Sequence, residues 1–355
     1  MPGWQQVNLN GFGDPGNTWV SSLEVFNGQF YAGTSNWDKG GTIWRSNDGI
    51  NWTNVTEPGF GDTYGNTNAV IVDMFEFRGK LYATTGWGGA PGQIWRSSNG
   101  TDWSQVVADG FGDPENGAIT VLEIFKDNLY AATHTPQSNG IEIWRSATGN
   151  NLDWTPVVIN GYGDANNVDC TGLIDFDGYL YAAVENNQDG LEVWRSLDGT
   201  GWNQVNVNGF GDAKNNHTSN WSVLNGYLYL ATRNYSTGGQ VWRTSNGTTW
   251  KQVMGNGFDD LNNQKIDTLY TYWNQIYAVT ENYVTGAEVW KSSNGITWFQ
   301  ANPDGFGDSN NVWTFWSPAI HAFNNDLYIG TTNSANGGEI WKKLSEKIYL
   351  PVIGK

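Results

Sequence analysis

The sequence predicts an all-β protein, a β-propeller of seven four-stranded blades whose ring is closed by its own N-terminal strand. Three repeated patterns predict this fold, and each occurs seven times along the 355 residues. They are an apolar-Trp-basic triplet, a stretch of the LYA type and a GFGD-type loop. The triplets recur about every 48 to 51 residues, in the range of propeller blades. A solenoid with polar end caps is the competing interpretation, and the split last repeat disfavours it.

Each repeat is predicted to be an antiparallel meander, because short alternating stretches are separated by Gly, Asn and Asp turns. The first repeat contains four such stretches, SSLEVF, QFYAGT, TIWRS and NWTNV. The third stretches carry Trp44, Trp95, Trp144, Trp194, Trp242, Trp290 and Trp341. The second stretches carry Tyr31, Tyr82, Tyr130, Tyr181, Tyr229, Tyr277 and Tyr328. The loops begin at Gly11, Gly59, Gly110, Gly161, Gly209, Gly257 and Gly305.

The N-terminal segment supplies the strand that the last repeat lacks. After Trp341 no turn followed by Trp occurs, whereas the WQQV segment that begins at Trp4 matches WTNV at Trp52. Closing the ring in this way removes free sheet edges. We therefore expect one propeller domain over residues 1–347, followed by a C-terminal extension over residues 348–355.

Composition argues against several classes of partner. The chain has 35 acidic and 18 basic residues, a net charge of -17, which repels phosphate backbones and anionic membranes. Nucleic acid is therefore not an expected partner. Cys170 is the only cysteine, so no internal disulfide and no cysteine metal cluster is expected. No apolar run approaches the roughly 20 residues that span a bilayer, so no membrane insertion is expected, and no signal-peptide pattern precedes the first repeat.

The turn between the third and fourth stretches resembles the Asp box of bacterial-neuraminidase-type (BNR) repeats. It reads SNDGINW at Ser46–Trp52 and SSNGTDW at Ser97–Trp103, and related sequences begin at Ser196, Thr244 and Ser292. Its Ser and Asp or Asn side chains can bond the backbone of the turn, and its Gly supplies a positive φ. The resemblance implies a propeller, and such propellers include sialidases, other glycan-active enzymes and non-catalytic proteins.

Sialidase activity is not expected. The resemblance implies three arginines that bind the substrate carboxylate, together with a Tyr–Glu pair. Outside the repeated basic position only Arg78 and Arg233 occur, and Arg78 falls in a hairpin on the opposite face. We therefore expect a non-sialidase member of this superfamily. An extracellular or cell-surface location is expected because the repeat type and composition resemble those of secreted bacterial propellers.

The GFGD-x-x-N loop offers oxygen atoms of the kind that bind calcium, for example at Asp14 and Asn17. A calcium loop usually assembles several carboxylates, whereas each of these loops has one Asp, one Asn and several glycines. We therefore predict a hydrogen-bonded turn.

A basic residue follows the Trp of every triplet, often near a glutamate. Its regular recurrence predicts ion pairs between blades, although a lectin with a sugar between each pair of blades would show the same repetition. The basic residues are Arg45, Arg96, Arg145, Arg195, Arg243, Lys291 and Lys342, and the glutamates are Glu142, Glu192, Glu288 and Glu339.

A single axial site is expected where the seven repeats differ. The divergent positions follow the second stretches and begin the innermost ones, and both sets are expected to meet on one face around the axis. Sugars offer hydroxyls to polar side chains, and their C–H faces stack on aromatic rings. The candidate ligand-binding residues are Trp37, Trp87, Asp169, His217, Tyr235, Asp267, Tyr283 and Trp316.

Four residues are candidate catalytic groups. Glu185 and Glu281 lie two blades apart with Arg233 between them, an arrangement suited to an acid and a base across a glycosidic bond. His134 is a candidate base. With His217 it also offers ligands to a metal, but two histidines without a ligand motif are weak evidence. No metal and no other cofactor is expected.

Three functions remain open at this stage. The leading one is a carbohydrate-binding, lectin-like propeller with a glycan or oligosaccharide in an axial polar and aromatic pocket. The second is a hydrolase or lyase that cleaves a glycan in the same pocket. The third is a scaffold that binds a protein partner at its rim. Whether the protein is an enzyme stays undecided.

Overall fold

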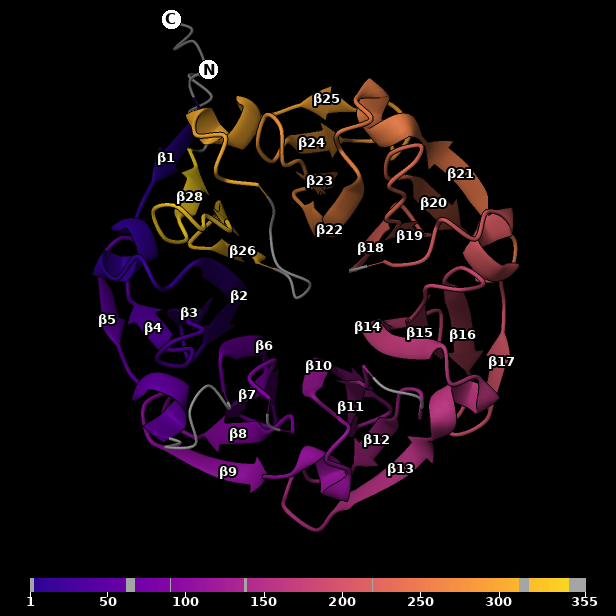
Figure 1. Ribbon diagram of the computed structural model, residues 1–355, viewed down its shortest axis with the longest axis horizontal. Helices are drawn as coiled ribbons and strands as arrows, with labels where there is room; N and C mark the ends of the chain where they lie inside the picture. The colour runs from indigo at the N-terminus through magenta and orange to yellow at the C-terminus, as the bar shows by residue number, and fades with distance from the viewer. Residues whose placement is uncertain are drawn as a thin grey trace, which may run out of the picture.

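The computed structural model describes residues 3–61, 68–89, 91–136, 139–218, 220–312 and 319–344. Within these residues the regular structure consists of antiparallel strands and short 3-10 helices, so the predicted all-β class is confirmed. Figure 1 shows the strands arranged in a ring around a central axis. The expected C-terminal extension, residues 348–355, lies outside the described residues.

The strands occupy four successive positions from the axis to the perimeter (Figure 1). Nearest the axis are β2 (Trp19–Phe26), β6 (Val70–Phe77), β10 (Ala118–Phe125), β14 (Asn167–Phe176), β18 (Trp221–Leu224), β22 (Lys265–Tyr272) and β26 (Ile320–Phe323). Next are β3 (Gln29–Ser35), β7 (Lys80–Gly86), β11 (Asn128–His134), β15 (Tyr179–Asn186), β19 (Tyr227–Ala231), β23 (Gln275–Glu281) and β27 (Asp326–Gly330).

The third position holds β4 (Ile43–Ser46), β8 (Ile94–Ser97), β12 (Ile143–Ser146), β16 (Glu192–Ser196), β20 (Val241–Thr244), β24 (Val289–Ser292) and β28 (Ile340–Lys343). At the perimeter are β5 (Trp52–Asn54), β9 (Trp103–Val107), β13 (Trp154–Val158), β17 (Trp202–Gln204), β21 (Lys251–Met254), β25 (Phe299–Gln300) and β1 (Trp4–Gln6). The 3-10 helices are η1 (Asn10–Gly13), η2 (Pro58–Gly61), η3 (Gly110–Gly112), η4 (Asn160–Gly163), η5 (Asn208–Gly211), η6 (Asn256–Asp259) and η7 (Asp304–Gly307).

Strands that follow one another in the chain pair antiparallel, as β2–β3, β3–β4 and β4–β5 do. The described strands form three sheets of four strands and one sheet of sixteen. Within the larger sheet, three contacts consist of a single residue pair each. They join β3 to β6, β7 to β10 and β11 to β14. β1 pairs with β28, with Gln5 opposite Lys342, so the first strand completes the sheet of the last three.

A repeated aromatic contact joins neighbouring groups of strands. Phe60 of η2 stacks on Trp95 of β8 with ring centroids 4.5 Å apart, and meets Trp103 of β9 edge-on at 5.6 Å. Such pairs contribute about 0.5–1.5 kcal/mol beyond their buried area. The equivalent stacked pairs are Phe12–Trp44, Phe111–Trp144, Tyr162–Trp194, Phe210–Trp242, Phe258–Trp290 and Phe306–Trp341.

The turns before the outer strands are held by their own side chains, as predicted. Asp48 Oδ1 accepts hydrogen bonds from the backbone N–H groups of Ile50 and Asn51, at 2.9 and 2.7 Å. Asn99 Oδ1 accepts the two corresponding bonds in the next turn, at 2.9 and 2.8 Å. Asn therefore replaces Asp here because the turn uses only one side-chain oxygen for these two bonds.

The loops of the GFGD type are hydrogen-bonded turns, which was also predicted. Asp14 Oδ1 accepts a hydrogen bond from the backbone of Gly16 at 3.0 Å. Asn17 Nδ2 donates to the carbonyl of Gly11 at 2.9 Å. Asn17 is buried and also receives a hydrogen bond from Asn36 at its side-chain oxygen. These contacts tie the loop to the end of β3.

The predicted ion pairs between the repeated basic residues and glutamates are wrong. Glu192 Oε2 accepts a hydrogen bond from the indole N–H of Trp194 at 2.8 Å. Arg195 instead donates to the carbonyl of Asn246, in the turn of the next repeat, at 3.2 Å. Side chains alternate along a strand, so Glu192 and Arg195, three residues apart in β16, project to opposite faces. Arg96 and Arg243 also donate to a carbonyl of the next repeat, whereas Lys342 forms an ion pair with Asp326 of its own repeat, 2.7 Å away.

Candidate functional site

The divergent positions of the repeats meet where second strands end and innermost strands begin. Cross-strand residue pairs hold their backbones side by side, both within one group of strands and between neighbouring groups. The pairs are His134 with Asp169, Asp169 with Glu185, His217 with Arg233, Arg233 with Lys265, and Lys265 with Glu281. Although these residues are far apart in the sequence, their side chains form an arc of ionisable groups beside the axis, which we call the axial arc.

Glu185 lies at the centre of a charged network. Its Oε1 atom accepts hydrogen bonds from Arg233 and from Asn187 Nδ2, both at 2.8 Å. Its Oε2 atom lies 3.4 Å from Nε2 of His217. Arg233 also donates from Nε to Asn216 Oδ1 at 3.1 Å. Charge-assisted bonds of this kind are strong when they are shielded from water, so the carboxylate and the guanidinium hold each other in place.

His134 and Asp169 form a second pair, with Nδ1 and Oδ2 3.3 Å apart. Burial lowers the pKa of His134, but the carboxylates of Asp169 and Glu185 outweigh it, so the pKa is raised overall. Asp169 is fully buried, and burial raises its pKa. The ring of Trp87 lies 5.8 Å from that of His134. His134 thus contacts both Asp169 of the charged network and the ring of Trp87.

A third group occupies the next strands. Lys265 Nζ lies 2.5 Å from Asp267 Oδ1, and both side chains are buried. Burial raises the pKa of Asp267 to about 7, although Lys265 opposes the shift. Burial also raises the pKa of Glu281. Burial, together with the positive charges of Lys265 and Arg233, lowers the pKa of His217 well below its usual value, so its imidazole is neutral.

Exposed aromatic rings accompany the charged residues. Trp37 is 39% exposed, Tyr235 57% and Tyr283 61%. The Arg233 guanidinium lies over the ring of Tyr235, 5.2 Å from its centroid. Burial, then Glu281, Asp267 and Tyr235, raise the pKa of Tyr283, so the two tyrosines belong to the same electrostatic environment.

The structure brings together most of the residues selected from sequence. Glu185, Arg233, His217, Asp169 and His134 are linked by direct contacts. Asp267, Glu281, Tyr235 and Tyr283 are linked to them through the charges of Lys265 and Arg233 or through one another. Trp37 packs edge-on against Trp19, at 5.5 Å, instead of contacting the ion pairs. Trp316 lies outside the described residues.

Three residues that complete the network were not selected as site residues. Lys265 neutralises part of the buried acid, and Asn187 and Asn216 bind Glu185 and Arg233 and each other. A signal for Asn187 existed, because it occupies the repeat position that holds Trp37, Tyr235 and Tyr283 elsewhere. Asn216 gave no such signal, since its side-chain bond depends on where Arg233 lies in space.

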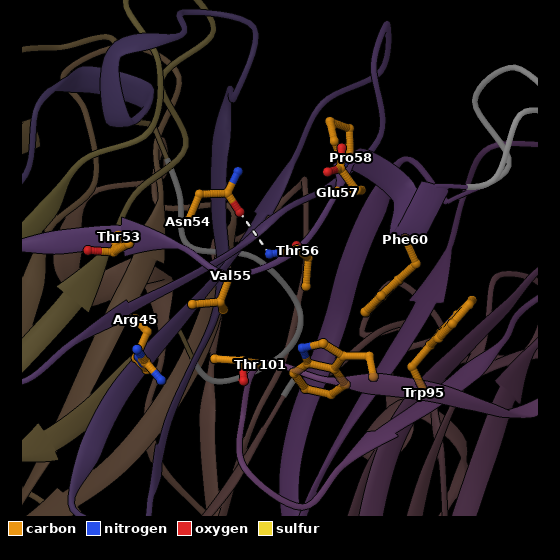
Figure 2. A pocket seen from close by; sticks show the side chains of 11 residues that line it. Arg45, Thr53, Asn54, Val55, Thr56, Glu57, Pro58, Phe60, Trp95 and Thr101 are labelled. Atoms are coloured by element: carbon orange, nitrogen blue, oxygen red, sulfur yellow. Dashed lines mark hydrogen bonds between the residues drawn. The ribbon is translucent and has the colours of Figure 1, made fainter.

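A cavity lies at the perimeter, among the third and outer strands of the first two repeats and away from the innermost strands that carry the arc of charges. It has a volume of about 690 Å³ and is lined by residues such as Arg45, Thr53, Phe60, Trp95 and Trp103. Figure 2 shows Phe60 beside Trp95, and the hydrogen bond from Thr56 to Asn54 on the facing loop. A pocket of about 390 Å³ between the following repeats is lined by the equivalent Phe111, Trp144 and Trp154. These cavities therefore repeat with the architecture, whereas the axial residues do not.

No protein-family model matches the chain, and no curated protein matches it either. Among the helices of the described residues, none has the length and apolar character needed to cross a bilayer.

Solved structures resemble it in fold. An ancestral GH74 enzyme is 13% identical with a TM-score of 0.65 over 92% of this chain, which spans about half (48%) of that enzyme. The polysaccharide lyase Uly1 is 11% identical with a TM-score of 0.56, covering 96% of this chain and 92% of its own. The WD40 β-propeller domain of Doa1 is 11% identical with a TM-score of 0.59, covering 98% and 99%. At these identities the likeness concerns the fold, and this chain is a β-propeller.

Proposed function

We propose that this protein is a glycan-binding propeller whose ligand lies over the axial arc of charged and aromatic residues. One observation carries the proposal. Three exposed rings, Trp37, Tyr235 and Tyr283, stand at the same position of three different repeats, and Tyr235 and Tyr283 lie beside the buried ion pairs. Exposed apolar groups that gather in one place are candidates for a binding surface. Flat rings stack on sugar C–H faces while amides and a guanidinium bind hydroxyls.

The charged floor favours binding over chemistry at Glu185. Both the guanidinium of Arg233 and the amide of Asn187 bind the same carboxylate oxygen. A carboxylate with one oxygen occupied in this way is less accessible to a substrate than a free one, but it orients the amides and the guanidinium toward a ligand. Asn187, which is exposed, and Asn216 extend these polar groups outward.

The same site has a second candidate function, cleavage of a glycan. It is favoured by the raised pKa values of His134 and Glu281, because perturbed titration is common among catalytic acids and bases. A GH74 enzyme and a polysaccharide lyase have a similar fold, so this scaffold is compatible with carbohydrate chemistry. The residues of this chain carry the argument, since one fold hosts many activities.

We further propose that the ring consists of seven blades of four strands, with β1 as the outer strand of the last. The consecutive pairing of strands supports this division, as do the single residue pairs that join the parts of the sixteen-stranded sheet. The side-chain bonding of the turns at Asp48 and Asn99 supports the proposed kinship with Asp-box (BNR) repeats outside the sialidases. An extracellular or cell-surface location and a protein partner at the rim stay predictions from sequence.

The test is a screen of the full chain on an array of neutral and acidic oligosaccharides, followed by titration of each hit. We expect Tyr235→Ala and Tyr283→Ala each to weaken binding by roughly 3- to 10-fold, since a ring contact is worth about 0.5–1.5 kcal/mol. Arg233→Ala is expected to weaken binding further. Trp273→Ala is the matched control, because Trp273 is 73% exposed but lies in the hairpin at the far end of β22 and β23.

Each outcome has a definite meaning. Equal losses in the Trp273 variant, or none in the axial variants, would move the glycan away from the axis, and more than one sugar per chain would direct it to the perimeter cavities. Mass spectrometry of the bound oligosaccharides separates binding from cleavage, and cleavage that disappears in Glu281→Gln would establish the second candidate. No binding to any glycan would reject both.

A further inference from the structure

Asp169, Glu185 and His217 bring two carboxylates and one imidazole to a single point beside the axis. One potential ligand atom from each residue lies within 4.8 Å of the others, and all three residues are buried. They come from β14, from β15 and from the segment before β18. The cross-strand pairing of Asp169 with Glu185, and of His217 with Arg233, fixes their backbones, so the arrangement is built into the sheet register.

From this arrangement we propose that Asp169, Glu185 and His217 form a binding site for a divalent first-row metal ion such as Zn²⁺, with further coordination positions open toward the mouth of the axis. Glu185 Oε2 and His217 Nε2 are 3.4 Å apart. Two ligands bonded to a tetrahedral zinc ion at about 2.1 Å are separated by about 3.4 Å. The other carboxylate oxygen, Oε1, is already bound by Arg233 and Asn187, so Oε2 is the atom directed at the site.

A buried carboxylate oxygen of Asp169 is a second, independent observation that points to a bound cation. Asp169 is fully buried, and its Oδ1 atom accepts no hydrogen bond from any residue that the structure describes. Buried carboxylate oxygens without a partner are rare and call for a bound ion or water. His134, 3.3 Å from Oδ2, holds the other side of this carboxylate as a residue behind a metal ligand commonly does.

The composition of the arc agrees with a bound cation. Its buried side chains include more acidic than basic groups, Asp169, Glu185, Asp267 and Glu281 against Arg233 and Lys265. Imidazole together with carboxylate suits zinc and its neighbours, whereas calcium takes six to eight oxygen ligands. The donor set therefore favours a first-row ion over calcium.

The test is a calorimetric titration of the EDTA-dialysed full chain with Zn²⁺, with Mn²⁺ and Ca²⁺ in parallel. We expect one Zn²⁺ per chain, weaker Ca²⁺ binding, and at least a tenfold loss of Zn²⁺ affinity in Asp169→Asn and His217→Gln. Asp73→Asn is the matched control, since Asp73 is also a buried aspartate on an innermost strand, β6, but is not one of the three ligands. Its Zn²⁺ affinity is expected to stay within twofold of wild type.

Two results of the titration would overturn the proposal. If the wild-type protein binds no Zn²⁺ at one equivalent, or if Asp169→Asn and Asp73→Asn weaken binding alike, the site does not exist as described. Should a variant unfold, the spectrum of Co²⁺ bound to the wild-type chain reports directly whether nitrogen and oxygen ligands surround the ion. The titration uses no glycan, so its failure would leave the proposed glycan function standing, and failure of the glycan screen would leave the metal site standing.

Discussion

At the scale of single residues, the chain keeps carboxyl groups in places where ionisation is costly. Glu123 on β10 is one of them. Burial raises its pKa to about 8, and the negative charges of Asp73 on β6 and Asp175 on β14 add to the shift, while the backbone N–H of Ile124 opposes it. Glu24 on β2 has a pKa raised to about 8 for the same main reason. Such groups are neutral in the folded protein at neutral pH and resist losing their proton.

A pH dependence of stability follows for Glu123→Gln. The folded pKa of about 8 exceeds the ordinary 4.5, so the stabilising contribution of the proton is complete below pH 4.5 and lost as the pH rises through 8. Glutamine keeps the oxygen that accepts from Ile124 but never ionises. We expect the variant to melt ~2 °C or more above wild type at pH 9, and close to it at pH 5.

Melting curves at the two pH values check this expectation. Glu57→Gln is the matched control, because Glu57 is exposed and its replacement should change the melting temperature little at either pH. A melting temperature of Glu123→Gln that does not rise relative to wild type between pH 5 and pH 9 would contradict the argument.

At the scale of elements, the turn before each outer strand also acts as a contact between repeats. Gly100 has φ +77°, and a Cβ placed on it would collide with the hydroxyl of Tyr31, which is fully buried on β3 of the preceding repeat. Gly149 meets Tyr82 in the same way, and Gly199 meets Tyr130. Glycine is therefore required in this turn for two reasons: the backbone has a positive φ, and the tyrosine of the preceding repeat leaves no room for a Cβ.

Comparison of two glycines separates these requirements. Gly79 has φ +68° and would place a Cβ in open space. Gly79→Ala is therefore expected to cost only the backbone strain of a left-handed alanine, about 1–2 kcal/mol. Gly100→Ala is expected to cost a further ~1–3 kcal/mol for the collision with Tyr31. Urea unfolding midpoints of the two variants measure the difference, and equal losses would mean that the tyrosine gives way without cost.

At the scale of the whole molecule, the two ends of the ring meet in one sheet. Trp4 of β1 packs edge-on against Phe306 at 5.3 Å and donates its indole N–H to the carbonyl of Ala301 at 2.8 Å. Both partners belong to the preceding repeat, so this residue links the first strand to β28 and to the neighbouring group of strands. Its contacts span nearly the whole length of the chain, and they close the ring.

Replacing Trp4 tests that closure. Trp4→Ala removes the ring contact and the indole hydrogen bond, and losses of buried tryptophan are typically about 3–5 kcal/mol. Because Trp4 is only partly buried, we expect a loss of ~2–3 kcal/mol, with greater aggregation as the edge of β28 becomes accessible. Gln5→Ala on the same strand is the control, since its side chain is exposed. Thermal melting and light scattering report both effects, and similar values for the two variants would contradict the role of Trp4.

The repeat order determined much of the fold in advance. Gly, Asn and Asp turns set the ends of the strands, and alternating residues set their faces, so the all-β class and the order of stretches followed from local chemistry. The pairing partner of Trp4–Gln6 followed from its match to later outer strands. The mistaken ion pairs of Glu192 and Arg195 came from treating nearness in sequence as nearness in space, although the alternation of a strand separates residues three apart.

The sequence by itself determined which positions differ among the repeats, and so which residues were worth following: Arg233, His217 and Asp169 are unlike their counterparts in the other repeats, and Glu185 shares its residue type only with Glu281. Only the tertiary structure decided how they combine. The contact of Glu185 with Arg233 joins residues 48 apart in the chain, and the approach of His217 to Glu185 depends on the register of two neighbouring groups of strands. Local patterns encode turns and strand faces because those depend on adjacent residues. Distances between side chains across an axis depend on how the sheets pack around it, which no single stretch of sequence specifies.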